Sequence, residues 1–173
     1  MDEKLKKEFW NMRFDLRRSY FYHEKRVLFW RTTLFLAQGM ETALNSTAAA
    51  FIFNENGATL TKWFVLASAI ISFIVVWFNA DKRIQSNMEK KARFLGLEEL
   101  IPCNEDEYTQ KRLDEIRQGR LKIELDDDVV LPCVDALARN DACRAFGLVE
   151  DRYLNLLECT LGRFLPIPYK KKP

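Results

Sequence analysis

The sequence predicts an all-α protein: a transmembrane helical hairpin (two transmembrane helices) with a long N-terminal helix before it and a C-terminal cytoplasmic helical region after it. Three observations predict this class. Charged residues make up 30% of the 173 residues, but between positions 34 and 80 the charged residues are Glu41, Glu55 and Lys62 alone. A turn sequence, Asn-Glu-Asn-Gly at 54–57, divides this apolar block into two runs of helix length. Lysine and arginine gather on both sides of the block, as they do in cytoplasmic flanks.

Residues 1–31 are predicted to form a basic cytoplasmic helix that runs into the membrane. The segment carries nine Lys/Arg against five Asp/Glu, and no Pro or Gly occurs before Gly39. Apolar side chains recur on it at helical spacing: Leu5, Phe9, Met12, Leu16 and Tyr20. Such a helix fits either an acidic leaflet surface or a position against the other cytoplasmic helices. We expect the packed position.

The hairpin itself is predicted at residues 32–80, with spans at about 32–53 and 60–80. The second span is the clearer one, because Lys62 is its one charged residue and Trp63 and Trp77 lie near its ends, where indole rings favour headgroups. About 20 residues are needed to cross roughly 30 Å of hydrocarbon. The alternative for this run is the buried core helix of a soluble protein. The first span holds polar residues and gains support from its partner.

The orientation follows from the basic residues beside the spans. Residues 81–95 carry five Lys/Arg against two Asp/Glu, and residues 1–31 are basic as well, whereas the turn region carries Lys62 alone. Both termini are therefore predicted to be cytoplasmic and the turn external, in a multi-pass protein of the cell inner membrane. The lipid bilayer is the first partner that the sequence predicts.

The first span carries a polar seam, made of Arg31, Gln38, Glu41 and Asn45. These residues are spaced 7, 3 and 4 apart, so they share an arc of about 80° on a helix, with Leu34 as its apolar member. A second set forms a small-residue face that allows close helix packing: Gly39, Ala43, Thr47 and Ala50. In the second span, Ser68 and Ser72 also share one face.

A carboxylate at the depth of Glu41 costs about 3 kcal/mol or more and usually faces a bundle interior or water. One hairpin cannot enclose a lumen. We therefore expect a homo-oligomer that turns the polar seam inward and forms a wet core or a gated pore. Two alternatives stay open: a seam that satisfies itself across a non-conducting contact, and a bond from Glu41 to Ser68 or Ser72 within the hairpin.

Residues 81–173 are predicted to form a cytoplasmic helical region. The expected helices cover 81–95 (ending at Gly96), 105–125, 128–146 (ending at Gly147) and 153–165. The three aspartates at 126–128 are interpreted as the N-cap of the third helix, since consecutive carboxylates point in different directions and lack the spacing of a Ca²⁺ loop.

The sequence offers no constellation typical of an active site. It contains no P-loop, dinucleotide fingerprint, G-x-S-x-G or H-E-x-x-H. His23 is the only histidine, and the cysteines form no C-x-x-C pair, which argues against a zinc site. Because the predicted topology leaves the cysteines in a reducing compartment, free thiols are expected at Cys103, Cys133, Cys143 and Cys159. We therefore expect no enzyme activity, no catalytic residues, and no cofactor or metal. The net charge of +2 also argues against a nucleic-acid partner.

The layout resembles the SLATT superfamily of bacterial two-transmembrane proteins: a basic helix, a hairpin with a short external turn, then cytoplasmic helices. The stretches Arg-Leu-Lys-Ile-Glu at 120–124, Val-Leu at 130–131 and Ala-Arg-Asn-Asp at 138–141 also look like the soluble part of small prophage-borne membrane proteins. The resemblance implies a homo-oligomeric, pore-forming effector in antiviral or mobile-element conflict, usually paired with a separate sensor. The alternative is a non-conducting membrane adaptor, such as a prophage exclusion factor that binds another membrane protein.

Overall fold

The computed structural model describes residues 3–52, 58–126 and 130–150, together with residues 152, 154, 155, 158, 162, 163, 166 and 167; the side chains of 49–52 and 58 are outside this description. The secondary structure of the described residues is helical throughout. The chain divides into two compact units. One comprises Met1–Arg26 and Ser86–Pro173, and we call it the bundle unit; the other, Val27–Gln85, is the hairpin unit.

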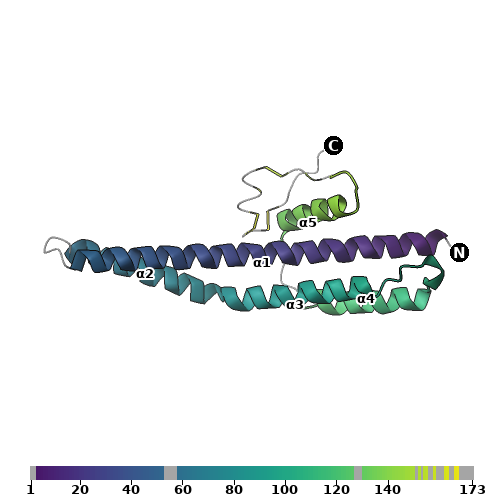
Figure 1. The fold of residues 1–173 in the computed structure, drawn as a ribbon, viewed down its shortest axis with the longest axis horizontal. Coiled ribbons are helices and arrows are strands. Elements are labelled where there is room, and N and C mark those ends of the chain that lie inside the picture. The colour runs from purple at the N-terminus through teal and green to yellow at the C-terminus, as the bar shows by residue number, and fades with distance from the viewer. Residues whose placement is uncertain are drawn as a thin grey trace. The chain divides into compact units, whose positions relative to one another are not determined.

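Helix α1 runs from Glu3 to Ile52 and contributes to both units (Figure 1). The predicted continuity of the basic segment with the apolar segment is therefore confirmed. The helix has no proline, and Glu3 lies in its first turn, where a negative charge interacts favourably with the helix dipole.

In the hairpin unit, α2 (Ala58–Phe78) lies beside the C-terminal part of α1 (Figure 1). The buried and half-buried residues of α1 recur with spacings of three and four, in the manner of a heptad seam: Trp30, Leu34, Ala37, Glu41, Leu44 and Ala48. On α2 the corresponding residues are Thr61, Phe64, Ser68, Ser72 and Val75. The two helices thus pack along one line, beside which Phe29, Thr33, Ala67 and Ile71 are also half-buried, and most of the remaining surface of each helix is exposed.

One helical stretch of the described chain, Thr59–Glu99, is long and apolar enough to cross a membrane. It comprises α2 and α3 (Ala80–Glu99). Only 11% of its most apolar window is buried, so the described part of the chain does not cover α2 in the way that a soluble protein covers a core helix. Among the described residues α1 does not meet the same criterion, because Gln38, Glu41 and Asn45 lower the hydropathy of its apolar part.

The junction between α2 and α3 is a sharp local break at Asn79, which has a φ of 47°. Asparagine is one of the few residues with a side chain that enters this left-handed region readily. Arg83 Nε donates a hydrogen bond to the carbonyl of Phe78 over 3.0 Å, and its guanidinium carbon lies 5.2 Å from the ring centroid of Trp30. A cation therefore satisfies the C-terminal end of α2, where the helix dipole favours positive charge.

In the bundle unit, the helix boundaries differ from the prediction at three places. Helix α3 continues through Gly96 to Glu99, so the predicted end at Gly96 is wrong. The helix expected at 105–125 consists of a short 3-10 helix, η1 (Glu105–Glu107), and α4 (Gln110–Glu124). Helix α4 begins where the side chain of Thr109 accepts a hydrogen bond from the backbone N–H of Arg112, which is an N-cap that sequence reading missed.

Helix α5 covers Pro132–Ala145, so the predicted start at residue 128 with an aspartate cap is wrong. Leu131 precedes the helix with extended backbone angles (φ −89°, ψ 111°), because a residue before proline is driven out of the helical region. The predicted stop at Gly147 is confirmed by its φ of 67°. Asp127, Asp128 and most of the helix predicted at 153–165 lie outside the described residues; of those described, Leu154 and Asn155 are not helical, whereas Glu158 is.

The main core of the bundle unit lies between α1, α3 and α4. It contains Phe9, Met12 and Leu16 of α1, Phe94 of α3, Ile101, and Leu113, Ile116 and Ile123 of α4. On the other side of α1 (Figure 1), α5 contributes two smaller clusters, formed by Tyr22 with Leu131, Val134 and Ala138, and by Phe14 with Ala142 and Cys143. The packed position expected for residues 1–31 is therefore confirmed as far as Arg26.

Candidate functional site

The structure divides the predicted polar seam between two surfaces of the hairpin unit. Glu41 is half-buried on the line that packs against α2, whereas Arg31, Gln38 and Asn45 are exposed. We call these three residues the exposed stripe. The small-residue face is also turned away from α2, since Gly39, Ala43 and Thr47 are exposed; the side chain of Ala50 lies outside the described residues.

Glu41 finds its partner within the same chain. Ser72 Oγ donates a hydrogen bond to Glu41 Oε1 over 2.6 Å and lies 3.0 Å from the carbonyl oxygen of Ser68. A hydroxyl carries one proton, so there are two ways to satisfy this group. Either Ser72 donates to a carboxylate, or a protonated carboxyl donates to Ser72 while Ser72 donates to Ser68. Both give the carboxyl of Glu41 a hydrogen-bond partner without a second chain, which is one of the alternatives that the sequence left open.

The side-chain amides of the exposed stripe differ from Glu41 in their hydrogen bonding. Thr42 Oγ1 donates a hydrogen bond to the backbone carbonyl of Gln38 over 2.8 Å, but within the described part of the chain the side-chain amides of Gln38 and Asn45 have no hydrogen-bond partner. Each carboxamide offers two donors and an acceptor. In water this would carry no cost, whereas in hydrocarbon these groups require partners from another molecule.

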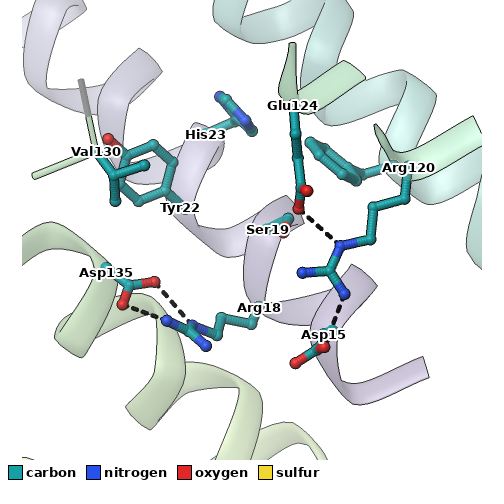
Figure 2. A pocket seen from close by; sticks show the side chains of 10 residues that line it. Asp15, Arg18, Ser19, Tyr22, His23, Arg120, Glu124, Val130 and Asp135 are labelled. Atoms are coloured by element: carbon teal, nitrogen blue, oxygen red, sulfur yellow. Dashed lines mark hydrogen bonds and ion pairs between the residues drawn. The ribbon is translucent and has the colours of Figure 1, made fainter. Parts of the chain in front are cut away.

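A second candidate site is a polar cavity of about 380 Å³ in the bundle unit (Figure 2). Its walls come from α1, α3, α4 and α5, and from Val130, which lies two residues before the start of α5. The lining residues are Asp15, Arg18, Ser19, Tyr22, His23, Phe94, Arg120, Glu124, Val130 and Asp135. None of them was singled out by sequence reading as a site residue.

Two arginines hold the walls of this cavity together, as Figure 2 shows. Arg18 donates through Nε (2.7 Å) and Nη2 to the two carboxylate oxygens of Asp135. Arg120 donates through Nε to Glu124 and through Nη1 to Asp15, both over 2.7 Å. Burial lowers the pKa of Arg120, but the hydrogen bonds to Glu124 and Asp15 outweigh burial and leave that pKa above its ordinary value. These ion pairs join α1 to α5 and to α4.

Aromatic residues form the remaining wall. His23 is 1% exposed, and its ring is stacked on Phe94 at a centroid distance of 5.4 Å. The nitrogen Nδ1 lies 2.9 Å from Oδ1 of Asn87; because an amide oxygen only accepts, this orientation assigns the proton to Nδ1. The hydroxyl of Tyr22 accepts the backbone N–H of Leu131 over 3.2 Å. The cavity therefore has a polar lining in which two guanidinium groups pair with three carboxylates.

The arrangement of the cavity is that of a structural junction. Its three carboxylates and two guanidinium groups are engaged in ion pairs. None of these ion pairs brings a nucleophilic side chain next to a general base. Among the residues that the structure describes, no cluster of three or more histidine, cysteine or acidic side chains could hold a metal ion. Cys103, Cys133 and Cys143 are free thiols, and Cys159 lies outside the described residues.

One signal in the sequence would have pointed to this junction. Asp15, Arg18, Ser19, Tyr22 and His23 are spaced three and four apart on α1, so they share one side of the helix. That side carries the chain's single histidine beside four side chains able to form hydrogen bonds. The carboxylate partners in α4 and α5 could not be paired with it from spacing alone.

No family model matches this sequence, and neither a curated protein nor a solved structure is similar enough to count as a match.

Proposed function

We propose that this chain is a multi-pass protein of the cell inner membrane that self-associates and forms a pore, as an effector in conflict with viruses or mobile elements. The observation that carries the membrane assignment is the apolar surface of the hairpin unit. Phe35 on α1 is 73% exposed and Trp77 on α2 is 71% exposed, and further large apolar side chains of the same two helices are also exposed: Leu36, Met40, Trp63, Phe73, Ile74 and Val76. A soluble monomer rarely exposes so large an apolar patch.

The proposal has both α2 and the C-terminal part of α1 cross the bilayer. The main obstacle to a span in α1 is the free-energy cost of placing the carboxyl of Glu41 in hydrocarbon. The hydrogen bond from Ser72 reduces this cost. Arg31, Lys82 and Arg83 flank the two spans at the end opposite the turn, which supports a cytoplasmic location for that end and for both termini.

Self-association follows from the exposed stripe. Gln38 and Asn45 lie on the surface of the same helix that exposes Phe35 and Met40, so in a monomer their amides would face lipid. Hydrogen bonds between membrane helices contribute about 0.6 kcal/mol each and up to about 2. The small-residue face offers a second surface for close packing. A ring of hairpins that turns the exposed stripe inward gains these bonds and encloses a polar, hydrated path.

A non-conducting adaptor is the second candidate, and one observation favours it. The bond between Ser72 and Glu41 uses the carboxyl within the chain, so the group best suited to attract cations is not directed at a path. On this reading the exposed stripe binds another membrane protein through its amides, and no hydrated path forms.

The decisive experiment compares wild type with the double variant Gln38→Leu/Asn45→Leu in nanodiscs and planar bilayers. We expect an oligomeric wild type that conducts, and a double variant that inserts but has a smaller mass and no conductance. Phe35→Leu/Met40→Leu is the matched control, because it changes two exposed apolar residues of the same helix and should resemble wild type. A monomeric wild type at all protein concentrations contradicts self-association. An oligomer without conductance in any lipid supports the adaptor instead.

The orientation has its own test in intact cells. A cysteine introduced at Asn56, in the turn, should react with a membrane-impermeant maleimide, whereas the exposed thiol of Cys103 should not. Cell lysis should make Cys103 reactive, which shows that protection came from the membrane. Reaction of Cys103 before lysis, with Asn56→Cys protected, reverses the proposed orientation.

A further inference from the structure

We infer that Ser72 is the positioning residue of Glu41: its hydroxyl holds the carboxyl against α2 and away from the exposed stripe of Arg31, Gln38 and Asn45. Loss of this single hydrogen bond would add a carboxyl to the stripe. The inference deepens the proposed function, since the position of Glu41 then decides whether the hydrated path contains an acidic group.

The position of Glu41 on α1 makes both orientations accessible. At about 100° per residue, the exposed stripe covers an arc of about 40°. Glu41 lies about 60° from the middle of that arc, and the line of contact with α2 lies only about 25° further on. The side chain is half-buried, so it lies at the border between the two surfaces. A rotation about its flexible side-chain bonds is enough to move the carboxyl from one to the other.

The hydroxyl of Ser72 is the group that selects the inward orientation. It lies 2.6 Å from Glu41 Oε1, which is the distance of a strong hydrogen bond to a carboxyl oxygen. The other α2 residues on the contact line include Phe64 and Val75, which have no polar side-chain atoms, and Ser68, whose backbone carbonyl lies near Ser72. Substitution of Ser72 by alanine therefore removes the donor while the apolar packing around it stays.

The contact links the position of the carboxyl to hydration. In hydrocarbon, Glu41 leaves Ser72 only at the penalty of an unsatisfied carboxyl, which keeps it in place. Beside a water-filled stripe this penalty disappears, because water replaces the serine. The geometry therefore makes the inward orientation the resting one and the outward orientation a property of an assembled, hydrated path.

The test measures the reactivity of Glu41 itself, in full-length protein reconstituted in liposomes. Dicyclohexylcarbodiimide enters lipid and forms a stable adduct with accessible carboxyls, and mass spectrometry of peptides measures the rate at Glu41. A typical hydrogen bond corresponds to about a tenfold change in population, so Ser72→Ala should be labelled about tenfold faster than wild type. Ser72→Thr keeps the hydroxyl and should be labelled like wild type. Glu41→Gln should lose the adduct.

Ser68→Ala is the matched control. It removes a buried serine hydroxyl one helical turn away on the same helix and leaves the Ser68 carbonyl in place. Its labelling rate should equal that of wild type. The inference is overturned if Ser72→Ala is labelled at the wild-type rate, or if Ser68→Ala is labelled as fast as Ser72→Ala, because the effect would then come from loosened packing.

Conductance separates this inference from the proposed function. If copies form a pore, Ser72→Ala should increase cation preference, and Glu41→Gln in the same chain should remove the increase. Labelling that depends on Ser72 without conductance in any variant refutes the pore and leaves the positioning role intact. Conductance with labelling that is independent of Ser72 refutes the positioning role alone.

Discussion

Tyr22→Phe removes one oxygen atom at the contact between α1 and α5 and leaves the aromatic ring in place. Tyr22 is 8% exposed, and its hydroxyl accepts hydrogen bonds from the backbone N–H of Leu131 at 3.2 Å and from Nη1 of Arg26 at 3.4 Å. Leu131 immediately precedes α5, and the following Pro132 has no N–H to donate. The phenol thus anchors the start of α5 to the bundle unit.

The expected loss of stability follows from the backbone N–H of Leu131, which has no acceptor once the phenol oxygen is removed. A buried backbone N–H without an acceptor costs about 1–3 kcal/mol, and the bond to Arg26 adds little at 3.4 Å. The ring keeps its contacts with Leu131, Val134 and Ala138, so no cavity contributes. The loss should be local to α5, because the main core of α1, α3 and α4 does not contain Tyr22.

Hydrogen–deuterium exchange of the full-length protein in detergent measures this effect segment by segment. In Tyr22→Phe, amides at the start of α5 should exchange between about fivefold and about 150-fold faster, while those of α4 keep their rates. Tyr108→Phe is the control, because the ring of Tyr108 is stacked on Phe9 at 4.2 Å and its hydroxyl has no hydrogen bond within the described part of the chain. Unchanged exchange in α5, or equal acceleration in α4, would refute the anchoring role.

Three further predictions concern single side chains. Phe94→Ala should lower the free energy of unfolding by about 3–5 kcal/mol, measured by thermal circular dichroism, since Phe94 is 1% exposed within the main core. The hydrogen bond to Glu24 raises the pKa of Lys91 despite burial. The stabilisation by Lys91 should therefore be present at neutral pH and disappear as the pH rises through this raised pKa. The difference in melting temperature between wild type and Lys91→Gln should accordingly shrink in strongly alkaline buffer. Asn79→Ala should cost about 1 kcal/mol because of the positive φ, whereas Asn79→Gly should melt close to wild type.

Helix α1 shows what sequence reading recovers well. Its apolar spacing at Phe9, Met12 and Leu16 predicted a packed face, and those residues lie in the main core. The absence of proline predicted a continuous helix, and α1 runs from Glu3 to Ile52. Both inferences are local, because they depend on periodicity and backbone restrictions within one segment.

The errors concern contacts between segments. The polar seam was interpreted as one surface because Glu41 lies within about 80° of Arg31 on a helical wheel; in the structure Glu41 is half-buried and bonded to Ser72, which sequence reading had kept as an alternative. Similarly, the aspartates at 126–128 looked like a cap, whereas α5 begins at Pro132. The cavity was missed for the same reason, since Arg18 and Asp135 are 117 residues apart in sequence. A helical wheel places residues on a face but cannot identify the neighbouring element.

The ion pairs of α1 also change how its positive charge is interpreted. In the bundle unit, Arg17 pairs with Glu98, Arg18 with Asp135 and Lys25 with Asp141, while the apolar face of the same helix is buried in the core. A helix bound to a lipid surface needs both of these features free, the apolar face for the acyl region and the cations for anionic headgroups. In the bundle unit this apolar face is buried and these three cations are engaged in ion pairs, although Lys4, Lys6 and Lys7 near the N-terminus are exposed. If the proposed function is right, we therefore expect the hairpin unit to make the main contact with the membrane, and the basic residues beside the spans to determine its orientation.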